Sequence, residues 1–350
     1  MHLLKSTLQN IQEVDQEIMK EERKKVDGLL KPQGSLGVLE KIAVQLSGIY
    51  RTTDLKPLKK AVVVCAADHG IVEEGITSAP QEVTAFMTNN IIVEGKSGVG
   101  AISKTMGADI VVVDVGVNAD LDNPKVISRK IRRGTNNLAK GPAMSREEAI
   151  QSIEVGIEIA NTLIEEGYNI LATGEMGIGN TTPSSAIIAT LTGKDPIEVT
   201  GIGANLSEKK LKKKVEVIRK GLEINKPNKK DALDVLAKVG GLEIGAMAGV
   251  MIAGAQRHIP VVIDGFISTA SAAIAIGLEP KIFDYLLCSH ISLEKGAKIA
   301  SSFLGFEPYL DMGLRLGEGS GATLNFGIIE AAINMTREME FYSKTEIEVI

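Results

Sequence analysis

Residues 314–324, LRLGEGSGATL, place one acid, Glu318, between two glycines, and a third glycine follows shortly after. Glycine lets the backbone approach a ligand closely and adopt positive φ values, so an acid in such a loop is either a turn residue or a reactive group. A carboxylate works well as a general base when partial burial raises its pKa towards the operating pH. Leucines on both sides of Glu318 could supply that burial. A general base and a turn glutamate before a helix therefore both remain open.

A second segment, TGEMGIGNTTPSS at 173–185, has the composition of an anion-binding loop. Its glycines can expose backbone N–H groups, Asn180 or one of the next two threonines could cap a helix, and a helix N-terminus favours phosphate. The segment lacks the third glycine of a dinucleotide fingerprint. EGKS at 94–97 has the lysine and serine of a P-loop, but Asn90 replaces its first glycine. Phosphate binding at 173–185 and a plain tight connection are both open.

Serines and histidines form a third group of candidates. In SHISLEKGA, residues 289–297, Ser289 and Ser292 could cap a helix or donate to a phosphate, and capping is the commoner role. His69 and His290 each follow a short apolar run, and a histidine in such a place usually bonds to neighbouring backbone. No GxSxG segment marks a serine nucleophile.

Three aspartates also follow apolar runs. Asp68, Asp114 and Asp264 could form turns, or could hold loops by accepting backbone N–H groups. We expect a structural role for Asp114, leave Asp68 open, and favour a functional role for Asp264. No CxxC or histidine-rich spacing predicts a metal site. The two cysteines, Cys65 and Cys288, are expected to be buried thiols in a reducing compartment.

The elements that position these residues begin with short, almost continuously apolar runs. Such runs are typical of strands that are buried on both faces of a parallel sheet. The predicted strands cover residues 61–68, 109–116, 169–175, 259–265 and, more weakly, 285–290. Each ends in polar or glycine-rich residues, so the five ends together predict one lined crevice.

Helical patterns separate the predicted strands. Residues 145–166 begin at Ser145 with Glu148 three positions later, which is the pattern of a capping box. Further helices are predicted over 205–224, 230–238 and 242–256. Alternation of strands and helices predicts an α/β fold, an open, Rossmann-like parallel sheet with helices on both faces, in which ligands bind beyond the carboxyl ends of the strands.

The two ends of the chain differ from the middle because they are helical and carry no comparable strand. We predict that residues 1–50 and 320–350 form one small helical domain. Residues 51–319 then form the large α/β domain that carries the crevice. The loop at 314–324 would lie between the two domains.

Composition narrows the class of protein. The 350 residues carry a net charge of −5, which disfavours nucleic acid as a partner. Lysines at 209–214 and 226–230 are expected to be solvated. Residues 1–17 lack the apolar core of a signal peptide, and the apolar stretch at 242–255 is too short to span a bilayer. The sequence predicts a soluble cytoplasmic protein that does not bind a membrane.

Eight segments together resemble one known family, the nicotinate-nucleotide:dimethylbenzimidazole phosphoribosyltransferases. The resemblance covers nearly the whole chain, and the segments occur in the family's order. They are DGLLKPQGSLGVLE (27–40), AADHGI (66–71), TGEMGIGNTTP (173–183), VTGIGANL (199–206), KVGGLEIGAMAGVM (238–251), DGFISTASA (264–272), SHISLEKGA (289–297) and RLGEGSGA (315–322).

The resemblance implies transfer of the 5-phosphoribosyl group from nicotinate mononucleotide to a benzimidazole nitrogen. The products would be α-ribazole 5′-phosphate, the nucleotide of the cobalamin lower ligand, and nicotinate. It also implies a homodimer, no cofactor and no metal, and Glu318 as the base that takes the acceptor proton. The residues that match nucleotide- or phosphate-contacting positions are Gly174, Glu175, Gly177, Gly203, Lys214 and Ser292.

The acceptor pocket is where this chain departs from the pattern. By resemblance Pro80, Met176 and Leu316 line it. Ala79 and Met87 stand where some relatives have Ser and Gln, so the pocket is expected to be more apolar. The native acceptor, whether dimethylbenzimidazole, another benzimidazole or adenine, is therefore left open.

Two other functions fit parts of the sequence. A nicotinamide-dinucleotide oxidoreductase could use the same scaffold, but the incomplete glycine fingerprint argues against it. A non-catalytic binder of a nucleotide or a cobamide precursor could retain the fold. Intact Glu318 in an intact loop argues against that alternative.

Overall fold

The computed structural model describes residues 2–203 and 206–344. Within them six parallel strands form one sheet, in the order β3-β2-β1-β4-β5-β6. The strands are β1 (Lys60–Ala67), β2 (Ala108–Gly116), β3 (Ile127–Ser128), β4 (Ile170–Met176), β5 (Val261–Ile263) and β6 (Leu286–Cys288). The five predicted strands are confirmed. The short edge strand β3 was not predicted because its two residues are exposed and belong to no apolar run.

The strand order reverses between β1 and β4. From β1 the chain builds β2 and β3 on one side, then returns to β4 on the other side and continues outwards through β5 and β6. The connections on the two sides of such a reversal diverge and leave a crevice beyond the carboxyl ends of the strands. The fold therefore places a binding site where β4 ends.

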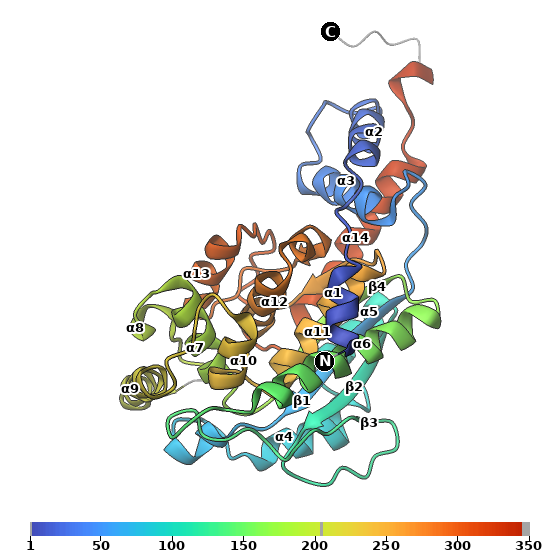
Figure 1. Ribbon diagram of the computed structural model, residues 1–350. Coiled ribbons are helices and arrows are strands. Elements are labelled where there is room, and N and C mark those ends of the chain that lie inside the picture. Colours follow the sequence, from blue (N-terminus) through green and yellow to red (C-terminus); the bar gives the residue numbers. More distant parts are fainter. Residues whose placement is uncertain (1, 204–205, 345–350) are drawn as a thin grey trace.

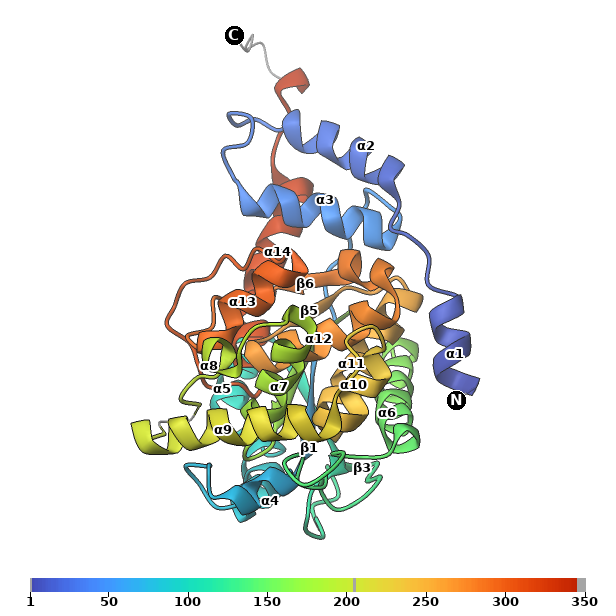
Figure 2. The same ribbon diagram turned by 60° about the vertical axis from the view of Figure 1, so that its left-hand side comes forward.

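Helices cover both faces of the sheet (Figures 1 and 2). Alternate residues of β1 point to opposite faces, Val63 into a core with α6, α11 and α12, and Val64 into a core with α3, α5 and α14. The helices are α1 (His2–Gln9), α2 (Gln16–Asp27), α3 (Val38–Tyr50), α4 (Glu82–Phe86), α5 (Gly98–Met106), α6 (Arg146–Glu165), α7 (Thr181–Thr192), α8 (Pro196–Val199), α9 (Glu208–Asn225), α10 (Ala232–Val239), α11 (Leu242–Gln256), α12 (Phe266–Leu278), α13 (Lys295–Leu304) and α14 (Ser320–Glu338). The Rossmann-like α/β fold is confirmed.

The helices predicted in the middle of the chain correspond to α6, α9, α10 and α11. The predicted capping box is present, since Glu148 N–H donates to Ser145 and the Glu148 carboxylate accepts from the Ser145 N–H. Asn205, the first residue of the helix predicted over 205–224, lies outside the described residues, and α9 begins at Glu208. None of the described helices combines the length and apolar character that crossing a membrane requires.

Helices α2 and α3 from the N-terminal part of the chain and α14 from the C-terminal part form a helical lobe above the sheet (Figures 1 and 2). There α14 packs against α3, α3 packs against α2, and Leu30 N–H donates to the Glu340 carbonyl at 2.7 Å. Helix α1 instead packs against α6 and α11 beside the sheet. The division into two domains stays a prediction, and residues 345–350 of the predicted small domain lie outside the described residues.

Candidate active site

A cavity of about 300 Å³ opens beyond the carboxyl ends of β4, β5 and β6. Its walls come from the segments that follow these strands, from the loop at 315–318, and from parts of 76–87 and 203–214. The ends of β1 and β2 do not line it. The prediction of one crevice lined by five strand ends is therefore correct for three of them and wrong for two. The cavity lies on the β4, β5 and β6 side of the strand-order reversal, and β1 and β2 lie on its other side.

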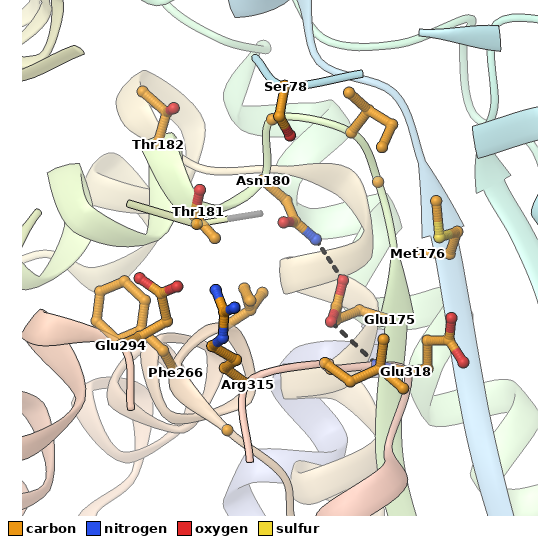
Figure 3. Close-up of a pocket in the computed structure, with 18 of the residues that line it drawn as sticks. Ser78, Glu175, Met176, Asn180, Thr181, Thr182, Phe266, Glu294, Arg315 and Glu318 are labelled. Carbon is orange, nitrogen blue, oxygen red and sulfur yellow. Dashed lines mark hydrogen bonds between the residues drawn. The ribbon is translucent and has the colours of Figure 1, made fainter. Parts of the chain in front are cut away.

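Glu318 stands at the end of the loop before α14 and lines the cavity (Figure 3). The residue is only 7% exposed, and its Oε2 has no hydrogen-bond partner. Burial raises the pKa of Glu318, whereas the Val99 N–H and the Ser97 hydroxyl lower it. A buried carboxyl with a raised pKa and one oxygen without a hydrogen-bond partner is suited to accept a proton from a ligand.

The start of α5 faces this carboxyl. Ser97 caps α5 by accepting from the Gly100 N–H at 3.3 Å. A Cβ atom added at Gly98 would lie 3.8 Å from Glu318 Oε2 and 2.5 Å from Leu316 Cδ2. The glycine at 98 thus lets the helix approach the loop of Glu318. The EGKS segment, which has only part of the P-loop pattern, therefore leads into the start of α5, and its last residue, Ser97, lies beside Glu318.

Glu175 lies at the end of β4, between the two ends of the cavity (Figure 3). One carboxylate oxygen accepts from the Asn180 side chain, and the other accepts from the Glu318 N–H at 3.3 Å. Burial raises the pKa of Glu175 to about 8, and the nearby acids Asp264 and Glu243 add to the effect. A cationic ring bound beside Glu175 would favour its ionised form.

Lys214 of α9 and Thr181 of α7 meet at the opposite end of the cavity. The Lys214 side chain is 1% exposed, and its Nζ donates to Thr181 Oγ1 at 2.7 Å. Burial lowers the pKa of Lys214 to about 8, and the Glu294 carboxylate opposes that shift. Because Thr181 is the first residue of α7, a cation and a helix N-terminus meet at one point, which is the arrangement of an anion site.

Three comparisons bear on this arrangement. A family model described as phosphoribosyltransferase matches residues 11–347. The chain is 52% identical to nicotinate-nucleotide–dimethylbenzimidazole phosphoribosyltransferase of Alkaliphilus metalliredigens over 100% of both chains, and 49% identical to that of Clostridioides difficile over 99% of both. A crystal structure of the Thermus thermophilus protein of this name superposes with a TM-score of 0.89 at 39% identity, covering 94% of this chain and 98% of that one. The chain belongs to this phosphoribosyltransferase family.

The positions that the resemblance assigns to the nucleotide or its phosphate lie around the cavity with one exception. Glu175, Gly177, Gly203, Lys214 and Ser292 line the cavity. Gly174 lies behind the wall, where an added Cβ would collide with the Glu318 carbonyl oxygen. Its lack of a side chain lets β4 pack against the backbone of the catalytic candidate.

The residues assigned to the family's acceptor pocket divide in the same way. Met87, Met176 and Leu316 line the cavity, whereas Ala79 and Pro80, the two residues after the lining residue Ser78, do not. The lysine run on α9 also divides, because Lys214 is buried and the lysines before it are exposed. The expectation that those neighbours are solvated is confirmed.

The histidines and aspartates at strand ends have different roles in this family member. Asp114 accepts the Val117 N–H at 2.8 Å away from the cavity, which confirms the structural role expected for it. His69 does not bond through its ring to backbone as expected. Its Nε2 contacts Glu243 Oε1 at 2.8 Å, and both side chains are buried. The sequence offered no signal for this pair, because Glu243 lies in a helix 174 residues further on.

Several lining residues were missed in the sequence. Thr181 was considered only as a possible cap, and Glu294 and Arg315 were not singled out, yet all three line the cavity on the side away from the Glu318 carboxyl (Figure 3). Asn180 occupies the N-cap position of α7 but caps nothing, because its amide is directed at Glu175. No cluster of three or more potential metal ligands occurs in residues 2–203 and 206–344.

Proposed function

We propose that the protein transfers the 5-phosphoribosyl group of nicotinate mononucleotide to 5,6-dimethylbenzimidazole or a closely related base. The observation that carries the proposal is the pairing, in one cavity, of a buried carboxyl at Glu318 with a buried cation at Lys214. The names of the relatives from Alkaliphilus metalliredigens and Clostridioides difficile specify the same donor and acceptor. The products are α-ribazole 5′-phosphate, for the lower ligand of cobalamin, and nicotinate.

The proposed reaction exchanges one C–N bond for another. The unprotonated nitrogen of the benzimidazole forms a bond to C1′ of the ribose as the bond from C1′ to the pyridinium nitrogen breaks. The electron pair of the broken bond stays on the pyridine nitrogen, so nicotinate leaves with a neutral ring nitrogen. Glu318 accepts the N–H proton of the other benzimidazole nitrogen. Attack from the face opposite the leaving group converts a β-nucleotide into an α-riboside.

The residues supply binding as well as proton transfer. Lys214, Thr181 and the start of α7 are proposed to hold the phosphate. Glu175 lies next to the Glu318 backbone, where its carboxylate would favour a cationic pyridinium nearby. Holding both reactants in one cavity replaces an encounter in solution with a step in a fixed geometry.

The test is incubation with nicotinate mononucleotide and a panel of benzimidazoles and purines, followed by mass spectrometry. We expect a riboside phosphate of at least one benzimidazole and an equal amount of nicotinate. A protein that forms no riboside phosphate with any base would refute the proposal. Quenching or enhancement of NADH fluorescence on titration would instead support an oxidoreductase.

Acceptor choice gives a direct prediction. Met87, Met176 and Leu316 make the acceptor end of the cavity apolar, so adenine, with more polar edges, would lose hydrogen bonds to water without replacing them. In competition with equal concentrations of adenine and dimethylbenzimidazole, we expect the benzimidazole product to exceed the adenine product by at least about tenfold. A preference for adenine would contradict this account of the pocket.

The pH dependence provides a further prediction. Lys214 must be protonated to hold a phosphate, and burial lowers its pKa to about 8. The kcat/KM for nicotinate mononucleotide, which reports the free enzyme, should therefore fall as the pH rises through about 8. It should also fall at acidic pH, once Glu318 is protonated. Lys214→Gln is neutral at every pH, so this variant should lose the alkaline fall, and its persistence would assign that fall to another group.

The resemblance also leads us to propose a homodimer. Several apolar side chains are half exposed or more in the single chain, as expected of surfaces that pair. They are Phe86, Ile197, Leu293, Phe303 and Met312. The small helical domain from the two termini is proposed on the same basis.

A further inference from the structure

Asp264, at the carboxyl end of β5, accepts hydrogen bonds from backbone N–H groups on both sides of the start of α14. Its Oδ1 accepts the N–H groups of Gly321 at 2.8 Å and Ala322 at 2.9 Å, and its Oδ2 accepts the N–H of Gly319 at 3.2 Å. The residue is 5% exposed, and burial raises its pKa although the backbone donors and His290 lower it. The three donors lie one, three and four residues after Glu318 in the chain.

Glu318 needs such support because its backbone is in the left-handed region, with φ of +62°. Residues with a side chain rarely adopt this conformation, and it persists only where the surroundings determine it. The Glu318 N–H is held by Glu175 at 3.3 Å, and the next N–H, of Gly319, is held by Asp264. Two buried carboxylates therefore hold the backbone on both sides of the Glu318 side chain. They are Glu175, at the end of β4, and Asp264, directly after β5.

His290 confines the same helix start from another side. A Cβ atom added at Gly321 would collide with His290 Nδ1, so the helix fits against the ring only because residue 321 is glycine. The Ser289 hydroxyl donates to the Ile263 carbonyl at 2.7 Å, which leaves Nδ1 of His290 to donate to Ser289 Oγ at 3.1 Å. His290 Nδ1 lies 3.9 Å from Asp264 Oδ1.

We propose that Asp264 is a positioning residue for the transfer, one that acts through Glu318 by holding its loop and the first turn of α14. The inference rests on the proposed function in so far as Glu318 is the base. Asp264 also lines the cavity, so direct contact with a substrate is the competing role. The two roles differ in what they change: positioning affects kcat and loop order, and contact affects substrate affinity.

The test is Asp264→Asn, which keeps the shape but turns one acceptor oxygen into an N–H donor facing N–H groups. We expect kcat to fall about 10- to 100-fold, the size of effect produced by a displacement of a reacting group by about 1 Å. The Kd of nicotinate mononucleotide, measured by calorimetry, should change less than about threefold. Combined with Glu318→Gln, the substitution should lower kcat little further, because both changes disable the same proton transfer.

Hydrogen exchange gives a readout that needs no activity. Peptides covering 314–324 should exchange at least about tenfold faster in Asp264→Asn than in the wild type. Asp114→Asn is the matched control, since Asp114 is a buried strand-end aspartate that accepts the Val117 N–H outside the cavity. It should leave kcat and the exchange of 314–324 unchanged.

Three outcomes would overturn the positioning role. They are multiplicative losses in the double variant, a tenfold rise in Kd at unchanged kcat, and wild-type exchange of 314–324 in Asp264→Asn. If Asp264→Asn does not fold, Asp264→Ser, which keeps one acceptor oxygen, serves in the same measurements. A wild-type protein without transferase activity would refute the proposed function, whereas the exchange comparison would still decide whether Asp264 orders the loop.

Discussion

Glu318→Gln should lower kcat for riboside phosphate formation by about 10²- to 10⁴-fold, the usual contribution of a general base. The amide matches the carboxyl in size and cannot accept the acceptor's proton. Because Glu318 is buried at one end of the cavity and Lys214 at the other, binding of nicotinate mononucleotide should be retained. Steady-state kinetics with dimethylbenzimidazole, and calorimetry with the donor alone, measure the two quantities.

Two further variants make this result specific. Glu318→Asp keeps a base on a shorter side chain and should fall between the wild type and Glu318→Gln. Glu22→Gln changes an acid of α2 that is 0% exposed and whose pKa is also raised by burial, but that lies outside the cavity. It should leave kcat unchanged. Turnover of Glu318→Gln close to that of the wild type would remove Glu318 from the mechanism.

Lys214→Gln should raise the KM and the Kd for nicotinate mononucleotide by about 10- to 100-fold. A hydrogen bond to a charged group contributes about 1.5–3 kcal/mol, and each 1.4 kcal/mol is a factor of ten in affinity. The loss of affinity should concern the donor, nicotinate mononucleotide. The KM of the acceptor, dimethylbenzimidazole, should change little. Calorimetric titration and initial rates at saturating dimethylbenzimidazole measure these effects.

The neighbouring lysine provides the control for this second variant. Lys213 lies on the same helix and is exposed, so Lys213→Gln changes the same charge without touching the cavity and should bind the donor normally. Nicotinate riboside, which lacks the phosphate, should bind the wild type and Lys214→Gln about equally. A riboside that loses affinity in Lys214→Gln as much as the nucleotide does would show that Lys214 does not act on the phosphate.

The fold was predictable because its signals are local. Strands β1 and β4 are nearly continuous apolar runs, and α6 begins with a capping box that four residues define. The exposed strand β3 was not predictable, because it is held by two paired residues of β2 rather than by its own composition. Helix α1 was expected in the terminal lobe, and no feature of its eight residues indicates that it packs against α6 and α11.

The site was predictable in part. Glu318 and the segment at 173–185 have glycine patterns that mark them, but Lys214 was separated from the other lysines of its run only by family resemblance. Contacts between segments that are far apart in the chain could not be predicted from the residues around either partner. Asp264 bonds to groups 55 to 58 residues further along the chain, and Glu175 bonds to a group 143 residues away. Such pairs become visible only once the sheet brings β4 and β5 side by side.

Helix α14 links the candidate active site to the terminal lobe. It begins two residues after Glu318, packs against β4, β5 and α5 near its start, and continues to α3 in the terminal lobe (Figures 1 and 2). Its 19 residues form a rod about 28 Å long, at 1.5 Å per residue. One continuous helix thus spans the distance from the terminal lobe to the loop of Glu318, and Asp264 holds its first turn.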